Sequence, residues 1–362
     1  MREPTLYDGT LGRAMSPHTV LFVGGGSIGH IAPSIAVAHA LRERLPEAQM
    51  HFVVSTRPDD VSFVEKAGFS VTPFDAPRLS WNVLWKFLRT TRSARSLLQQ
   101  LKPAVIFSKG GYVSVPVCHA AHALGIPIVL HESDAVSGWA NWMVSRWAVA
   151  ICRGFGTRKN HPKDAFTGTP VREDMATGSR QRGLMVTGLS RMRPVLLVVG
   201  GSQGALALNR AVAHALPELL ELCEIIHLTG KGKGTVIGNP PGYWQCPFAI
   251  EEYPHLFAAA DLALSRAGAT TLMELAAIGL PAILVPLEGV AHDHQRRNAE
   301  AAVKSGGCIL LDQERLAASL VPTVRHLIEA TDSRLIMASA IKTLHRPEAA
   351  RQIAEVIARQ LA

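Results

Sequence analysis

Apolar segments of strand length alternate with helix-like segments along almost the whole chain. In the first half the predicted strands are 19–23, 50–54, 104–107, 128–130 and 149–151, and in the second half they are 195–199, 225–228, 262–264, 282–285 and 309–311. Because these segments are apolar at nearly every position, we expect strands buried on both faces, as in parallel sheets. The alternation therefore predicts an α/β protein.

Glycine-rich turns follow the first predicted strand of each half. The first reads GGGSIGH at residues 24–30, and the second reads GGSQG at residues 200–204. A helical pattern follows each turn, so main-chain amides and the positive end of a helix can hold an anion there. Two such turns indicate two lobes that face one phosphate-bearing ligand. The alternative is a tight turn that only packs a helix against a strand.

The chain has 362 residues, which is too long for most single cores, so we expect two domains. The polar segment 172–193 contains Gly178, Gly183 and Gly188 and predicts a linker between them. The last predicted helix, at about residues 347–362, is amphipathic.

Charge and cysteine usage narrow the functional class. The formal net charge of +8 favours anionic partners such as phosphorylated substrates, nucleic acid or acidic lipid. We expect no nucleic-acid partner, because the sequence has no zinc module and does not interleave aromatic with basic residues. The five cysteines are scattered without a Cys-x-x-Cys pair, which indicates a reducing compartment and no zinc site. Residues 1–17 lack the apolar core of a signal peptide, and we expect a cytoplasmic protein.

The first glycine turn could also belong to a dinucleotide site. A site for NAD needs a carboxylate at the end of the second strand, but the sequence there is Ser55-Thr56-Arg57, so NAD is disfavoured. Arg57 could meet a 2′-phosphate, which leaves an NADP-linked oxidoreductase as an alternative. The segment GKGKGT at 230–235 lacks the P-loop pattern and is interpreted as a basic loop.

A third turn, at residues 265–274, follows a predicted strand and opens a helix. Glu274 has two interpretations: it closes a capping box that begins at Thr271, or it accepts hydrogen bonds from ribose hydroxyls. Further on, Gln295 and Asn298 share one face of a helix at the carboxyl edge of the predicted sheet, where ligands bind. The alternative there is an ordinary polar helix start with Asp293 as its cap.

These motifs together resemble one known family. The series runs GGSIGH at 25–30 with Pro33, GGYVS at 110–114, HESD at 131–134, GTPVR at 168–172 and GGSQGA at 200–205. It continues with residues 265–274, GLPA at 279–282 and DHQ at 293–295. In this order, over about residues 20–313, the chain resembles the MurG family of N-acetylglucosaminyltransferases, which complete lipid II of bacterial peptidoglycan.

The resemblance implies a GT-B fold, in which two Rossmann-like, doubly wound parallel-sheet domains flank a cleft. We place the N-terminal domain, which faces the acceptor and the membrane, at residues 16–171, and the C-terminal, UDP-sugar-binding domain at residues 172–345. The final helix, at about residues 346–362, is expected to pack back on the first domain.

The resemblance also implies an inverting transfer from UDP-N-acetylglucosamine without a cofactor or bound metal. Glu274 would hold the uridine ribose, Ser202 the diphosphate and Arg172 the uracil. The remaining donor contacts are expected from Ser27, Gly29, Ala269, Thr270, Thr271 and Gln295.

The implied acceptor is undecaprenyl-diphosphate-linked N-acetylmuramoyl pentapeptide. Contacts to its diphosphate are expected from Gly26, Tyr112 and Ser114. Because the acceptor is a lipid, we expect peripheral binding to the anionic cytoplasmic face of the bacterial inner membrane. Other cell-wall synthesis proteins are candidate partners. The membrane-contacting residues would be Trp81, Leu84, Trp85, Leu88 and Arg89. The alternative is a core-packed helix with a solvated basic face.

Four residues depart from the family pattern on the acceptor side, and one of them is Val115, which stands where the family often has a small residue. Ile28, Ser133 and Asp134 stand where the family has glycine, glutamine and asparagine. These departures leave open an enzyme that glycosylates another lipid-linked acceptor.

His30 is the first candidate for the general base, because the positive end of its helix disfavours imidazolium. Asp134 is the alternative base, and a purely phosphate-binding or capping role for His30 is the structural alternative. The chain has no Asp-x-Asp motif, so helix N-termini are expected to stabilise the leaving diphosphate. A non-catalytic sugar-nucleotide-binding subunit is the alternative from another functional class.

Overall fold

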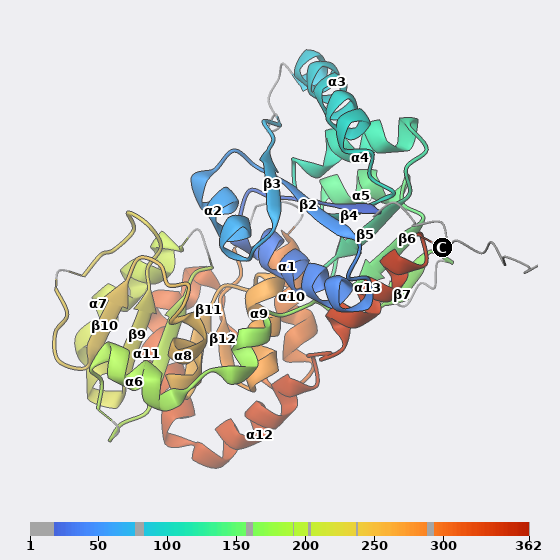
Figure 1. Ribbon diagram of the computed structural model, residues 1–362. Coiled ribbons are helices and arrows are strands. Elements are labelled where there is room, and N and C mark those ends of the chain that lie inside the picture. Colours follow the sequence, from blue (N-terminus) through green and yellow to red (C-terminus); the bar gives the residue numbers. More distant parts are fainter. Residues whose placement is uncertain are drawn as a thin grey trace, which may run out of the picture.

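The protein folds into two lobes, each built on one parallel sheet (Figure 1). The computed structural model describes residues 18–76, 83–156, 162–190, 192–201, 204–236, 238–287 and 293–361. Helices cover both faces of each sheet, so the predicted α/β class with doubly wound parallel sheets is confirmed.

The N-terminal sheet contains β1 (Thr19–Gly24), β2 (Gln49–Val54), β3 (Ser70–Pro73), β4 (Val105–Gly110), β5 (Ile128–Glu132), β6 (Ala150–Arg153) and β7 (Asp164–Phe166). Their order across the sheet is β3-β2-β1-β4-β5-β6-β7. The helices of this lobe are α1 (Ile28–Arg44), α2 (Pro58–Lys66), α3 (Val83–Leu101), α4 (Ser114–Ala123) and α5 (Trp139–Ser145).

Side-chain packing on β1 explains why the strand is apolar without alternation. Val20 and Phe22 belong to a core shared with α1. Leu21 and Val23 point to the other face and join a second core with α3 and α4. Because each strand residue points to the face opposite its neighbour, a sheet covered on both sides needs an apolar residue at every position.

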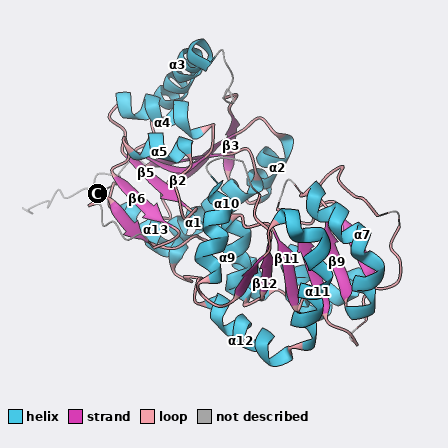
Figure 2. Ribbon diagram, turned by 180° about the vertical axis from the view of Figure 1, so that it is seen from behind, coloured by secondary structure: helices cyan, strands magenta, loops and turns pink. Residues whose placement is uncertain are grey.

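The C-terminal sheet contains β8 (Val195–Val199), β9 (Glu224–Leu228), β10 (Tyr243–Cys246), β11 (Leu262–Ser265), β12 (Ala282–Leu284) and β13 (Cys308–Leu310), in the order β10-β9-β8-β11-β12-β13. Its helices are α6 (Arg180–Thr187), α7 (Leu206–Leu222), α8 (Tyr253–Ala259), α9 (Ala269–Ile278), α10 (His294–Val303), α11 (Leu316–Glu329) and α12 (Thr331–Lys342). Figure 2 shows the strands of this lobe between layers of helices.

The last helix, α13 (Ala349–Ala358), leaves the C-terminal lobe and packs against α1 of the first lobe (Figure 1). Ile353, Ala354 and Ile357 are buried in the core that α1 and β1 share. The chain therefore crosses between the lobes twice, after β7 and before α13.

All ten predicted strands are present, and β3, β7 and β10 were missed. These three strands are short and lie at sheet edges, where most of their residues are only half-buried or exposed. An edge strand buries little surface, so its sequence carries little of the apolar signal on which the prediction depends.

The predicted linker at 172–193 is wrong for most of its length. It contains a short 3₁₀ helix (Glu173–Thr177) and α6. Ser179 caps the N-terminus of α6, because its hydroxyl accepts a hydrogen bond from the Arg182 amide. Gly183 is a packing residue, because a Cβ there would lie 2.1 Å from the His255 carbonyl oxygen of α8. The glycines that indicated a linker therefore allow two helices to pack closely.

No helix within the described ranges has the length and apolar character that a bilayer span requires.

The glycine turns after β1 and β4 pack directly against each other. Gly111 has a left-handed φ of +82°, and a Cβ on it would lie 2.8 Å from the Gly25 carbonyl oxygen. The first turn is also held from α2, where Asp60 accepts hydrogen bonds from the Gly26 amide and the Ser55 hydroxyl at 2.8 and 2.6 Å. These contacts place both turns at the carboxyl edge of the sheet.

We expect Gly111→Ala to destabilise the protein more than Gly125→Ala. Both positions have φ above +70°, so alanine costs about 1–2 kcal/mol of unfolding free energy at either. A Cβ at Gly125 would meet open space, whereas one at Gly111 would meet the backbone of the first turn, which adds about 1–3 kcal/mol. Urea denaturation of both variants measures the difference. Equal losses would contradict the close contact between the turns.

Candidate functional site

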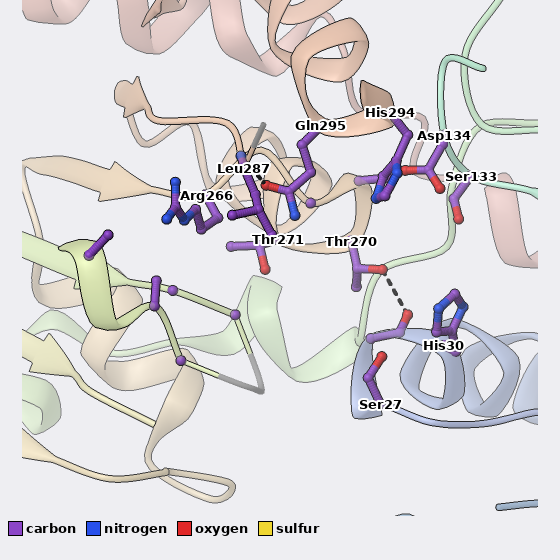
Figure 3. A pocket seen from close by; sticks show the side chains of 18 of the residues that line it. Ser27, His30, Ser133, Asp134, Arg266, Thr270, Thr271, Leu287, His294 and Gln295 are labelled. Carbon is purple, nitrogen blue, oxygen red and sulfur yellow. Dashed lines mark hydrogen bonds between the residues drawn. The ribbon is translucent and has the colours of Figure 1, made fainter. Parts of the chain in front are cut away.

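A cavity of about 580 Å³ lies between the lobes, where the carboxyl edges of the two sheets face each other (Figure 3). Open parallel sheets bind ligands at this edge. The residues predicted for the site that line this cavity are Ser27, Gly29, His30, Asp134, Ala269, Thr270, Thr271 and Gln295.

Direct hydrogen bonds hold the lobes together around the cavity. The Thr270 hydroxyl donates to the Gly29 carbonyl oxygen at 2.8 Å. Asn298, which is fully buried, donates to Asp134 Oδ1 at 2.8 Å and accepts from the Ala135 amide at 2.8 Å. Side chains of the C-terminal lobe therefore position the loop that follows β5 in the N-terminal lobe.

The N-terminus of α9 opens into the cavity. Gly268 precedes the helix, and Ala269, Thr270 and Thr271 form its first turn, which contains no acidic residue. The unpaired amides and the helix dipole make this turn favourable for a negatively charged group. Lys233 also lines this cavity and adds a positive charge. Ser202, the predicted diphosphate ligand, lies outside the described residues.

Gln295, at the start of α10, lines the cavity, and its Oε1 accepts a hydrogen bond from the Leu287 amide at 3.0 Å. Its side-chain amide nitrogen has no acceptor among the described residues and remains for a ligand. Asp293, proposed as the cap of this helix, precedes α10 with a left-handed φ of 53° and makes no capping hydrogen bond through its side chain.

Glu274 lies inside α9 and does not close a capping box. The helix begins at Ala269, and Glu274 Oε2 accepts a hydrogen bond from the Tyr253 hydroxyl at 2.8 Å. Burial raises the pKa of the carboxyl to about 7. The side chain faces a second, narrower cavity with about 70 Å³ of free space, which adjoins the first at Gly29, Thr270 and Thr271.

Arg172 lines the second cavity together with Glu274. Its guanidinium donates to Asp174 Oδ1 at 3.0 Å and to the Ile250 carbonyl oxygen at 3.1 Å, and it lies 5.5 Å from the centre of the Tyr253 ring. Apolar side chains form much of the remaining wall, including Phe63 and Phe248. The cavity thus joins apolar surfaces to one cation and one carboxyl group.

His30 lies in the first turn of α1 and faces the main cavity (Figure 3). Its pKa is lowered to about 4, first by burial and then by repulsion from Lys109, while Asp134 acts in the opposite direction. Nδ1 is buried and has no hydrogen-bond partner among the described residues. The imidazole is therefore neutral near pH 7 and can accept a proton.

Asp134 faces the same cavity within a group of charged and polar residues. Lys109, at the end of β4, is 1% exposed and donates a hydrogen bond to the Ser133 hydroxyl. Glu132 is also buried, which raises its pKa to about 6, and it accepts hydrogen bonds from the Asp134 amide and from Asn141 at 3.0 Å each. Figure 3 shows Ser133 and His30 on the same side of the cavity.

Several site residues were not predicted from the sequence, namely Lys109, Lys233, Tyr253, Arg266 and His294. The sequence does contain a signal for Lys109, because this lysine stands between a strongly apolar strand and a glycine turn. Lysine is rarely buried without a partner, so its place at the end of a buried strand indicates a functional site.

The residues predicted to contact the acceptor diphosphate line neither cavity as the structure describes them. The Tyr112 ring covers Gly26, and the Ser114 hydroxyl is buried and donates to the Gly110 carbonyl oxygen at 2.6 Å. Their contacts with an acceptor stay a prediction. The candidate NADP ligand Arg57 donates instead to the Gly26 carbonyl oxygen at 2.7 Å, which gives it a structural role in the first turn.

The predicted membrane segment is described in part. Trp81 and the side chains of Leu84 and Trp85 lie outside the described part of the chain. On α3, Leu88 is 44% exposed and Arg89 is exposed, whereas Ala94 and Leu98 are buried in the core. On α5, Trp139 and Trp142 are 43% and 50% exposed, which the sequence did not indicate.

Within the described ranges, no cluster of three or more His, Cys, Asp or Glu side chains could hold a metal ion.

Comparisons with known proteins agree with this architecture. Residues 20–152 match the glycosyltransferase family 28 N-terminal domain, and residues 195–353 match the glycosyltransferase family 28 C-terminal domain. The crystal structure of Acinetobacter baumannii MurG is similar with a TM-score of 0.73 and 26% identity, and the match covers 95% of this chain and 100% of that one. A UDP-GlcNAc 2-epimerase from Neisseria meningitidis, bound to UDP-GlcNAc, shares the fold with a TM-score of 0.71 at 13% identity.

Curated relatives are similar over most of their length. A UDP-N-acetylglucosamine--N-acetylmuramyl-(pentapeptide) pyrophosphoryl-undecaprenol N-acetylglucosamine transferase of Lachnoclostridium phytofermentans is 36% identical, with 93% of this chain and 98% of the relative covered. A transferase of the same name, numbered 2, from Bacillus cereus is 34% identical with the same coverage. The predicted GT-B fold is confirmed by these matches. The chain therefore belongs to the MurG family of glycosyltransferases.

Proposed function

We propose that the protein transfers N-acetylglucosamine from UDP-N-acetylglucosamine to undecaprenyl-diphosphate-linked N-acetylmuramoyl pentapeptide, with inversion, in peptidoglycan synthesis. The observation that carries this proposal is that the two cavities adjoin each other within one cleft. A carboxyl group and a cation in an apolar cavity suit a nucleoside, and the adjoining helix N-terminus suits its diphosphate. The names of the relatives support the identity of both substrates.

In this proposal the donor lies against the C-terminal lobe. Glu274 accepts hydrogen bonds from the ribose hydroxyls, and Arg172 contacts the uracil. The diphosphate lies at the first turn of α9, with Ser202 as a further ligand, and Gln295 contacts the sugar. The second, narrower cavity, which contains Glu274 and Arg172, is called the nucleoside cavity from here on. Because it has little free space, Ile28 and Phe63 of the N-terminal lobe would move aside as the donor enters.

Transfer requires the acceptor hydroxyl to lose a proton while the bond between the sugar and UDP breaks. His30 takes this proton in the proposed mechanism, because its imidazole is neutral at pH 7 and faces the cleft. Asp134 is less suited, since Asn298 already donates to its carboxylate. The bonding electrons pass to a diphosphate oxygen of UDP, where the amides of α9 stabilise the new charge without a metal ion.

We expect His30→Ala to lower kcat by about 10²- to 10⁴-fold, because it removes the proton acceptor. The Kd of UDP should stay within about twofold, since UDP binds mainly to the other lobe. Steady-state kinetics and calorimetry measure the two quantities. His39→Ala, which removes a second histidine of α1 outside the main cavity, is the matched control and should keep kcat. Equal losses of kcat and affinity in His30→Ala would reject the role of base.

The function itself is tested by UDP release from UDP-N-acetylglucosamine after addition of the lipid-linked acceptor, with and without EDTA. We expect turnover that EDTA leaves unchanged, because helix amides replace a cation. Binding of the donor without turnover would favour a non-catalytic subunit or another lipid-linked acceptor. Loss of turnover in EDTA that Mg²⁺ restores would reject stabilisation by the protein alone.

We further propose that the N-terminal lobe binds the anionic cytoplasmic face of the inner membrane. Helices α3 and α5 both pack against α4 and expose Leu88, Arg89, Trp139 and Trp142. The Arg146 guanidinium lies 3.5 Å from the centre of the Trp142 ring. Aromatic rings beside cations suit the boundary between lipid headgroups and acyl chains.

We expect the double variant Trp139→Ala, Trp142→Ala to bind anionic vesicles about tenfold more weakly, because two exposed aromatic side chains can no longer insert. Sedimentation with phosphatidylglycerol and with neutral phosphatidylcholine vesicles measures this. The control is Met185→Ala, Val186→Ala, which removes exposed apolar side chains from α6 in the other lobe. A similar loss in both double variants would contradict a membrane surface on the N-terminal lobe.

A further inference from the structure

A hydrogen bond between α8 and α9 holds the carboxyl group of Glu274, which lines the nucleoside cavity. The hydroxyl of Tyr253, the first residue of α8, donates a hydrogen bond to Glu274 Oε2 at 2.8 Å. The Tyr253 ring packs on Phe257, with the ring centres 4.4 Å apart, so the hydroxyl is held in place from its own helix. The bond therefore ties the carboxyl group of Glu274, on α9, to α8.

The two carboxyl oxygens of Glu274 have different surroundings. Oε2 is the oxygen that Tyr253 holds, and among the described residues no second side chain donates to the carboxyl group. Both residues line the nucleoside cavity, and Glu274 is 5% exposed. Oε1 is therefore the oxygen that remains for hydroxyl groups of a ligand.

The groups that act on the pKa of Glu274 come from two segments. Tyr253 faces it from α8, and Arg172 and Asp174 face it from the segment that precedes α6. Burial raises the pKa of the carboxyl to about 7, and the hydrogen bond from Tyr253 and the charge of Arg172 act against that rise. Near pH 7 the carboxyl group is thus close to the balance between its ionised and protonated forms.

We propose that Tyr253 is the positioning residue for donor recognition: it keeps Glu274 ionised and turns Oε1 toward the vicinal hydroxyls of a ribose. This inference rests on the proposed function. It assigns to Tyr253 a contribution to affinity and to the choice of ribonucleotide over deoxyribonucleotide. A tyrosine that only packed the cavity wall would need its ring and not its hydroxyl.

The test is calorimetric binding of UDP to Tyr253→Phe between pH 6 and pH 9. Without the hydroxyl the pKa of Glu274 rises further, so at pH 6.5 the Kd should increase about tenfold over wild type. At pH 9 the carboxyl is ionised in both proteins, and the two Kd values should agree within about threefold. The Tyr253 hydroxyl itself stays protonated over this range, because burial raises its pKa well above 10.

A second measurement compares UDP with 2′-deoxy-UDP at pH 7. Wild type should prefer UDP, because the deoxynucleotide leaves a buried carboxylate without a donor. In Tyr253→Phe this preference should shrink several-fold. Glu274→Gln removes the titrating group and should abolish the pH dependence of UDP binding between pH 6 and pH 9.

Tyr243→Phe is the matched control, because its hydroxyl is hydrogen-bonded to His227 at 2.9 Å and it lines neither cavity as described. Its UDP affinity should follow wild type at every pH. A constant ratio of Kd values between Tyr253→Phe and wild type across the pH range would overturn the inference alone. Failure of wild type to bind UDP at any pH would overturn the proposed function as well.

Discussion

The parallel direction of every described strand is the constraint on which the site depends. Parallel strands bring their carboxyl ends to one edge, and each following helix begins there with its positive end toward that edge. Two such sheets face each other across the cleft, so the first turns of α1 and α9 meet at the Thr270–Gly29 hydrogen bond. A place that favours an anionic group therefore arises at this meeting point from the backbone, before any charged side chain contributes.

Burial determines the protonation of the side chains around this backbone site. It is the largest cause of the lowered pKa of His30 and Lys109 and of the raised pKa of Glu274 and Glu132. Removal from water disfavours the charged form of each group, which moves bases and acids in opposite directions. The same desolvation that keeps His30 neutral therefore brings Glu274 near its titration point, and the hydrogen bond from Tyr253 acts to lower the pKa of Glu274 toward the ionised form.

The sequence predicted what depends on local pattern, and the remainder depends on tertiary contacts. Central strands were predicted because a doubly covered sheet demands uninterrupted apolar runs, whereas β3, β7 and β10 at the edges have no such demand. Gly183 was interpreted as part of a linker because glycine is typical of flexible segments. Close packing on His255 requires glycine as well, and the sequence alone does not distinguish the two causes. His30 and Glu274 were found through motifs. The partner of Glu274 was not, since Tyr253 lies on another helix and its spacing to Glu274 follows no local rule.

The departures from the family pattern at residues 133 and 134 form a coupled set with Lys109. A carboxylate at Asp134 adds negative charge to a loop that already contains buried Glu132, which is costly without compensation. Lys109 provides that compensation, because both carboxylates act to raise its pKa and its ammonium group donates to Ser133. Asn298 satisfies Asp134 from the opposite lobe. Lys109, Glu132 and Asp134 are thus each hydrogen-bonded within the fold, which explains how the loop after β5 tolerates two neighbouring carboxyl groups beside the cleft.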